Sequence, residues 1–282
     1  MNHSENYDLK INQINQKIIS QDNACQSIIH EMEIVEKLLS DFGFLTFGRD
    51  YSLCKNKYFS LQMISTSVEL TVGNIISCCR SGCLADANTL LRKYRDDLFF
   101  YLYIVVYDTS IKNESNKMKI AEMEKNIDNW INNNLSNLNI STVLKDIGQS
   151  SNIIEAVKKY KLQSYFDKMG TRLNNYVHSN GILYYNRNIN AYEQNDLQKP
   201  MSTLLKDMRY ITVAFFFLLT LCSPVLIMST DYIDYLECNS IPPKGSEYWV
   251  APFIADYLKN NSDMIDKNCI DYLKDNTLME LE

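Results

Sequence analysis

The chain has 282 residues, of which 46% are hydrophobic, so it is long enough to bury a sizeable core. Its formal charge of −6 argues against a nucleic-acid partner attracted by the field of the whole molecule, and phosphate binding would need a local basic patch. Only 8 glycines and 5 prolines are present, which favours an all-α helical bundle over a β-sandwich or barrel.

Residues 11–42 carry an apolar stripe with a period of 3.5 residues, which predicts one long helix that packs along another. Two partners remain open for this N-terminal segment (residues 1–45): the bundle of its own chain, or a second protomer in a coiled coil. The stripe consists of Ile11, Ile14, Ile18, Gln21, Cys25, Ile28, Met32, Val35, Leu39 and Phe42, of which only Gln21 is polar.

Residues 46–235 form the predicted main helical domain. Helical spacing of apolar residues predicts helices over 58–79 and 84–107, which fit a helical hairpin. Residues 109–151 are rich in Asn, Lys and Glu and are interpreted as a polar insertion over one end of the bundle. A further helix is expected over 153–169, ended by Gly170.

The segment after residue 181 is first aromatic and irregular, to about residue 192, and then reads as a long helix over 197–228. Residues 211–228 are apolar enough to approach the ~18 residues of a membrane span. Thr212, Thr220, Ser223 and Pro224 interrupt them, so burial inside the protein is favoured and a membrane-associated helical protein is a second alternative. Residues 236–282 are expected to form a C-terminal helical extension.

The eight cysteines, together with a start that lacks a basic segment followed by an apolar one, indicate a reduced cytoplasmic protein. Cys78, Cys79 and Cys83 lie close together but lack paired C-x-x-C spacing. Buried cysteine more often acts as a small hydrophobic residue. We therefore expect neither a metal site nor a cofactor.

The polar segment over residues 171–181 holds the residues best suited to chemistry. His178 is one of three histidines, and it is accompanied by Arg172, Asn174 and Asn175. Thr171 is expected to cap a short helix, with Gly181 at its other end. On such a helix Arg172 and His178 span an arc of about 120° and a rise of about 9 Å.

This arrangement resembles the Arg-x4-6-His motif of the HEPN superfamily (higher eukaryote and prokaryote nucleotide-binding domains), here with five residues between Arg172 and His178. Many members of that superfamily are metal-independent endoribonucleases of toxin, abortive-infection or phage-defence systems. Their active sites commonly form between two protomers. The resemblance covers about residues 58–228 and implies an RNA substrate, a homodimer and a possible antitoxin partner.

The resemblance also implies a role for each residue. His178 would transfer a proton near neutral pH, and Arg172 would hold the scissile phosphate through a charged, forked donor. Asn174 or Asn175 would orient the nucleotide, and Arg92 and Arg95 are weaker candidates for RNA contact. One histidine cannot easily act as both base and acid, so a dimer would supply the second.

Two simpler interpretations stay open. A non-catalytic module of the same type would use the motif to bind a nucleotide or a protein. Alternatively, Arg172 pairs with a nearby acidic residue, as Arg92 and Asp96 can on an exposed helix face, and His178 caps a helix. No Walker, dinucleotide-binding, zinc-protease or α/β-hydrolase motif is present.

Overall fold

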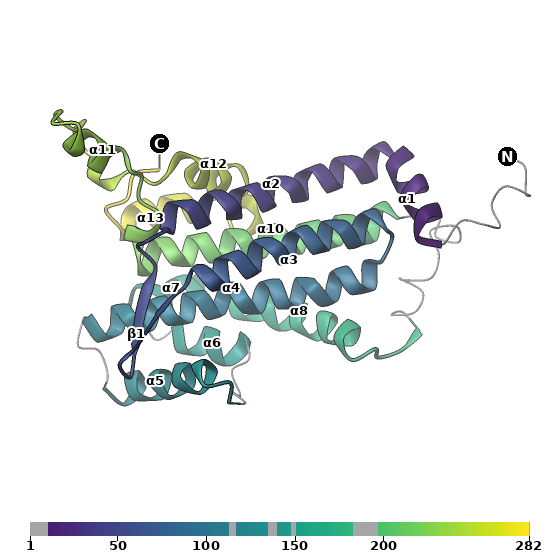
Figure 1. The fold of residues 1–282 in the computed structure, drawn as a ribbon, viewed down its shortest axis with the longest axis horizontal. Coiled ribbons are helices and arrows are strands. Elements are labelled where there is room, and N and C mark those ends of the chain that lie inside the picture. The colour runs from purple at the N-terminus through teal and green to yellow at the C-terminus, as the bar shows by residue number, and fades with distance from the viewer. Residues whose placement is uncertain (1–10, 113–116, 135–139, 148–150, 183–196, 282) are drawn as a thin grey trace, which may run out of the picture.

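The structure is a computed structural model that describes residues 11–112, 117–134, 140–147, 151–182 and 197–281. These residues are mostly helical, which confirms the predicted all-α class (Figure 1). The tail with His3 and the aromatic segment over residues 183–192 lie outside the described ranges. The described part of residues 236–282 contains α12 (Pro252–Asn260), α13 (Cys269–Asn276), two 3-10 turns and irregular segments, and Trp249 and Val250 form isolated β-bridges to Glu280 and Met228.

The centre of the fold is α10 (Gln198–Cys222), which begins with Pro200 in its first turn and packs between other long helices. Every residue from Tyr210 to Cys222 is buried, because α2 (Asn23–Thr46), α4 (Leu84–Lys112), α12 and α13 all contact α10. A helix enclosed in this way is apolar on all sides. No helix in the described part of the chain is both long and apolar enough to cross a membrane.

The N-terminal stripe forms two helices and not the predicted single one. Helix α1 (Ile11–Gln21) stops at Asp22, whose side chain accepts a hydrogen bond from the amide of Cys25 and caps α2. Phe42, near the far end of α2, packs edge-on against the rings of Phe215 and Phe216 of α10.

The apolar stripe of α2 is core. Cys25, Met32, Val35, Leu39 and Phe42 are at most 2% exposed, and α2 packs against α3 (Gln62–Arg80) and α10 of its own chain. The α2 half of the predicted stripe therefore packs on the bundle of its own chain, the first of the two alternatives, whereas Ile11 at the start of α1 is 57% exposed. The side chains of the α2 half are already enclosed by the bundle.

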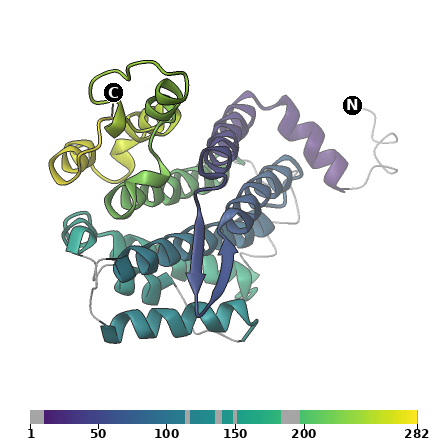
Figure 2. The same cartoon turned by 60° about the vertical axis from the view of Figure 1, so that its left-hand side comes forward.

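A β-hairpin, which the sequence pattern did not predict, follows α2. Strand β1 (Tyr51–Cys54) pairs antiparallel with β2 (Lys57–Ser60) through a turn in which Lys55 and Asn56 both have positive φ. Tyr58 therefore lies in a strand and not at the start of a helix. Figure 2 shows the hairpin descending from α2 to α5 (Lys117–Ile131), where Lys55 Nζ lies 3.0 Å from an Asp128 carboxylate oxygen.

The segment interpreted as a polar insertion is built onto α4. Helix α4 extends to Lys112, and α5 and α6 (Ile140–Ile147) pack against it. The buried hydroxyl of Tyr103 on α4 accepts a hydrogen bond from Asn126 and lies 3.4 Å from Asp146. Helix α7 (Ser151–Lys159) then leads, through Lys161 with positive φ, into α8 (Leu162–Val177).

Candidate functional site

The motif lies on the second half of α8, and His178 is its C-terminal cap residue. The helix runs through Gly170 and Thr171 without a break, so the predicted end at Gly170 is wrong. The Thr171 hydroxyl donates to the carbonyl of Asp167, as it does in a helix interior. The chain leaves the helix through Ser179, which has positive φ, and not through a cap at Gly181.

Gly170 of α8 faces the buried side chain of Arg95 on α4. A Cβ atom at this position would lie 3.1 Å from Nη1 of Arg95 on α4. Arg95 is 2% exposed; its Nε and Nη2 donate to Asp96, and its Nη1 has no partner among the described residues. The expectation that Arg95 contacts RNA is wrong, because its guanidinium is enclosed between the two helices.

Arg92 also faces Asp96, as its spacing of four residues along α4 predicted. Its Nε lies 3.6 Å from the second carboxylate oxygen, and its side chain is 30% exposed. Arg92 is thus partly accessible but shares its acidic partner with Arg95. A contact with RNA would compete with that ion pair.

Arg172 forms an ion pair with Asp207 of α10, and the Asp207 side chain is only 8% exposed. The Tyr165 hydroxyl lies 3.5 Å from the other oxygen of Asp207, and its ring stacks on that of Tyr210 at 3.5 Å between centroids. Burial lowers the pKa of Arg172, yet a guanidinium in contact with a carboxylate stays charged at neutral pH. This pair joins α8 to α10.

His178 and Asn175 lie on the solvent face of α8, and Asn174 is exposed beside them. Lys168, Thr171, Asn175 and His178 follow one another at steps of three and four residues, and all four are exposed. The imidazole of His178 has no hydrogen-bond partner in the part of the chain that the structure describes.

The structure does not bring Arg172 and His178 together in one chain. They are six residues apart, which on a helix separates them by about 120° around the axis and about 9 Å along it. Arg172 is turned to α10 and occupied by Asp207, whereas His178 faces solvent. A single chain therefore does not offer a phosphate-holding cation and a proton-transfer group at one point.

Two exposed lysines that the sequence analysis did not single out lie close in sequence to the two members of the Arg172–Asp207 pair. Lys168 stands one turn before Arg172 on α8, and Lys206 precedes Asp207 on α10; both are exposed and make no ion pair with described residues. The nearby acid Asp167 accepts hydrogen bonds from Ser141 and Gln163. The exposed residues Lys168, Asn174, Asn175, His178 and Lys206 are called the α8 patch.

A signal for one of these lysines was present in the sequence. Lys168 lies four residues before Arg172, the spacing at which helical side chains share a face. Lys206 had no such signal, because α10 meets α8 only through tertiary packing. No family model matches the chain, and no curated protein or solved structure is significantly similar to it.

Proposed function

We propose that this protein is a HEPN-like helical module that binds RNA through the α8 patch and does not cleave it as a single chain. The observation that carries the proposal is the exposed row on α8 that contains Lys168, Asn175 and His178; Lys206 of α10 is exposed and directly precedes Asp207, the partner of Arg172. Lysines contribute affinity for phosphate, and amide and imidazole groups can hydrogen-bond the unstacked bases of single-stranded RNA.

The local charge supports RNA binding at the α8 patch, although the molecule is acidic as a whole. Arg172 and Asp207 compensate each other, and Asp167 offsets one of the two exposed lysines, which leaves an excess of one positive charge among these groups. RNA binding requires such a local excess, because the formal charge of −6 repels a polyanion at long range. Binding through few phosphate contacts is expected to be weak and sensitive to salt.

The Arg172–Asp207 pair argues against catalysis by one chain. If Arg172 moved to a phosphate, the Asp207 carboxylate would be left buried without its counter-charge, at a cost of several kcal/mol. His178 alone would also have to supply both the base and the acid of an RNA cleavage without metal. A binding module needs neither the release of Arg172 from Asp207 nor a histidine that acts as both base and acid.

A metal-independent endoribonuclease of a defence or toxin system is the second candidate, and one observation favours it. The His178 imidazole is exposed and unengaged by described residues, so a second protomer could approach it. A centre shared by two protomers would place two such imidazoles together, one as base and one as acid. The apolar stripe of α2 cannot form that dimer, so α8 itself would lie at the interface.

Purified protein incubated with single-stranded RNA in EDTA tests both candidates. Binding should be measured by fluorescence anisotropy and cleavage on a gel, for the wild type, His178→Ala and the control His30→Ala, which removes an exposed histidine of α2. The binding module predicts RNA binding without cleavage.

Cleavage that survives in His30→Ala and disappears in His178→Ala would replace the binding module by the endoribonuclease. Absence of RNA binding by the wild type at low salt would contradict both candidates.

A further inference from the structure

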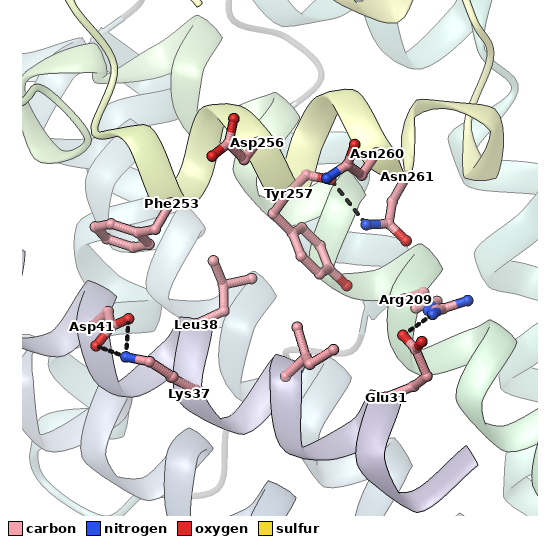
Figure 3. A pocket seen from close by; sticks show the side chains of 11 residues that line it. Glu31, Lys37, Leu38, Asp41, Arg209, Phe253, Asp256, Tyr257, Asn260 and Asn261 are labelled. Carbon is pink, nitrogen blue, oxygen red and sulfur yellow. Dashed lines mark hydrogen bonds and ion pairs between the residues drawn. The ribbon is translucent and has the colours of Figure 1, made fainter. Parts of the chain in front are cut away.

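A cleft of about 420 Å³ opens between α2 and α12, on the side of α10 that faces away from α8 (Figure 3). Its walls combine charged side chains with apolar ones, and the apolar ones include Leu38 of α2 and Phe253 of α12. Cavities that hold small molecules in proteins have volumes of about 300–1,000 Å³ and this mixture of walls. The cleft shares no residue with the α8 patch.

The charged groups of the cleft are unequally compensated. Lys37 donates to both carboxylate oxygens of Asp41, and Arg209 pairs with Glu31. Asp256 is the remaining charged group, and it has no ion-pair partner among the described residues. The lining therefore carries an excess of one negative charge, which favours a cationic ligand.

Tyr257 lines the cleft with its aromatic ring. This residue is 7% exposed, and its buried hydroxyl makes no hydrogen bond with described residues. It lies next to the buried Thr212 hydroxyl, which donates to the carbonyl of Met208 and shares a hydrogen bond with Tyr94. Figure 3 shows the Tyr257 ring pointing from α12 toward the Arg209–Glu31 pair, so Tyr257 offers the cleft its ring and not its buried hydroxyl.

The cleft also provides aromatic and aliphatic surface beside the unpaired carboxylate. Phe253 is half-buried one turn before Tyr257, and Ile34 and Leu38 face both rings from α2. Aromatic faces attract ammonium groups, and aliphatic walls favour an apolar ligand body. The carboxylate of Asp256 thus favours the cationic end of an amphipathic molecule, and the aromatic and aliphatic walls favour its apolar end.

We propose that this cleft binds a small organic ammonium ion with an aromatic or apolar body. The ammonium group donates to Asp256, and the body packs between Phe253 and Leu38. The volume of about 420 Å³ lies within the range of cavities that hold small molecules. The proposal is independent of RNA binding by the α8 patch.

Isothermal titration of the full chain with 2-phenylethylammonium tests the proposal, with the neutral 2-phenylethanol and the anionic 3-phenylpropanoate as comparators. Saturable binding of the ammonium ion is expected, with both comparators weaker. Asp256→Asn should weaken it by about tenfold, the worth of a charge-assisted hydrogen bond. The matched control Asp271→Asn removes an exposed charge of α13 outside the cleft and should leave the affinity unchanged.

Tyr257→Phe gives a second readout, because it keeps the ring that lines the cleft and removes a hydroxyl that the ligand does not reach. We expect this variant to bind 2-phenylethylammonium as tightly as the wild type. The proposal is overturned if the ammonium ion does not bind the wild type, if 3-phenylpropanoate binds as tightly, or if Asp256→Asn and Asp271→Asn behave alike.

Discussion

Several buried polar atoms of this protein lack a partner among the described residues, and Asp50 is the one with the clearest consequence. It is 2% exposed, neither carboxylate oxygen has a hydrogen-bond partner in the described part of the chain, and burial raises its pKa to about 6. Ionised Asp50 is therefore unfavourable in the folded protein. This burden grows as the pH rises.

The pH dependence follows from the direction of this shift. The folded pKa of about 6 exceeds the ordinary value of 3.8, so the folded state holds the proton more tightly between these two values. Stability contributed by protonated Asp50 is present at low pH and is lost as the pH rises through about 6. Above that pH the cost is on the order of 2–3 kcal/mol.

Asp50→Asn should remove this burden. We expect the variant to be more stable than the wild type by about 1–3 kcal/mol at pH 7.5 and by a smaller amount at pH 4.5, which lies between the two pKa values. Urea unfolding at both pH values measures the difference, with the exposed Asp234→Asn of α11 as the control. An equal gain at the two pH values would show that ionisation of Asp50 is not the cause.

The Arg172–Asp207 pair is expected to stabilise the fold. Arg172→Ala should destabilise the fold by about 1–3 kcal/mol, because it leaves the Asp207 carboxylate buried without a counter-charge. The double variant Arg172→Ala with Asp207→Ala should recover part of this loss. Urea unfolding of the three proteins decides the matter: equal stability of the single and double variants would mean that the pair is not coupled.

At the level of elements, the contact between α4 and α8 depends on a residue without a side chain. Gly170 leaves just enough room for the buried guanidinium of Arg95, which Asp96 holds from the other side. Gly170 would ordinarily weaken a helix, so its presence here reflects the close approach. Phe99 and Phe166, with centroids 4.6 Å apart, continue the same contact along the two helices.

Gly170→Leu should therefore separate α8 from α4 and cost about 1–3 kcal/mol, the usual range for an overpacked site. The neighbouring Thr171→Leu, at an exposed position of the same helix, is the control and should be within about 0.5 kcal/mol of the wild type. Thermal unfolding of both variants measures this. If Gly170→Leu is as stable as Thr171→Leu, the helices do not pack as closely as described.

Some elements were predicted from the sequence better than others, because only some of them depend on a pattern of neighbouring residues. The stripe from Cys25 to Phe42 is a local pattern, and it correctly predicted the buried face of α2. The hairpin was missed because its strands have four residues each and its turn, Lys55-Asn56, lacks the glycine that usually marks it. The break at Asp22 depends on one cap hydrogen bond that an uninterrupted stripe conceals.

The candidate site was predicted less well than the fold. The sequence placed Arg172 and His178 on one helix, but the partner of Arg172 lies 35 residues away on α10. Such a pair is a tertiary contact that helical spacing cannot reveal. For the same reason the enclosure of Arg95 between α4 and α8 became apparent only in the folded chain.

For the molecule as a whole, the buried face of α2 packs into the core of its own chain. Leu39→Ala should cost about 2–5 kcal/mol by opening a cavity in the core of the monomer. Its effect on the melting temperature should be the same at protein concentrations that differ a hundredfold. A melting temperature that rises with concentration for the wild type, and less for Leu39→Ala, would instead place α2 at a subunit interface.

We propose that this molecule, although acidic as a whole, binds RNA through the α8 patch. The most direct measurement is the salt dependence of its affinity for fluorescein-labelled single-stranded RNA. It compares the wild type with Lys168→Ala/Lys206→Ala and with the control Lys267→Ala/Lys274→Ala, which removes two exposed lysines outside the α8 patch.

The α8 patch predicts that the first double variant binds at least about tenfold more weakly and that its slope of log affinity against log salt falls by about 1.4, or 0.7 for each lysine. The control should match the wild type. Equal affinities and equal slopes for the two double variants would contradict RNA binding by the α8 patch.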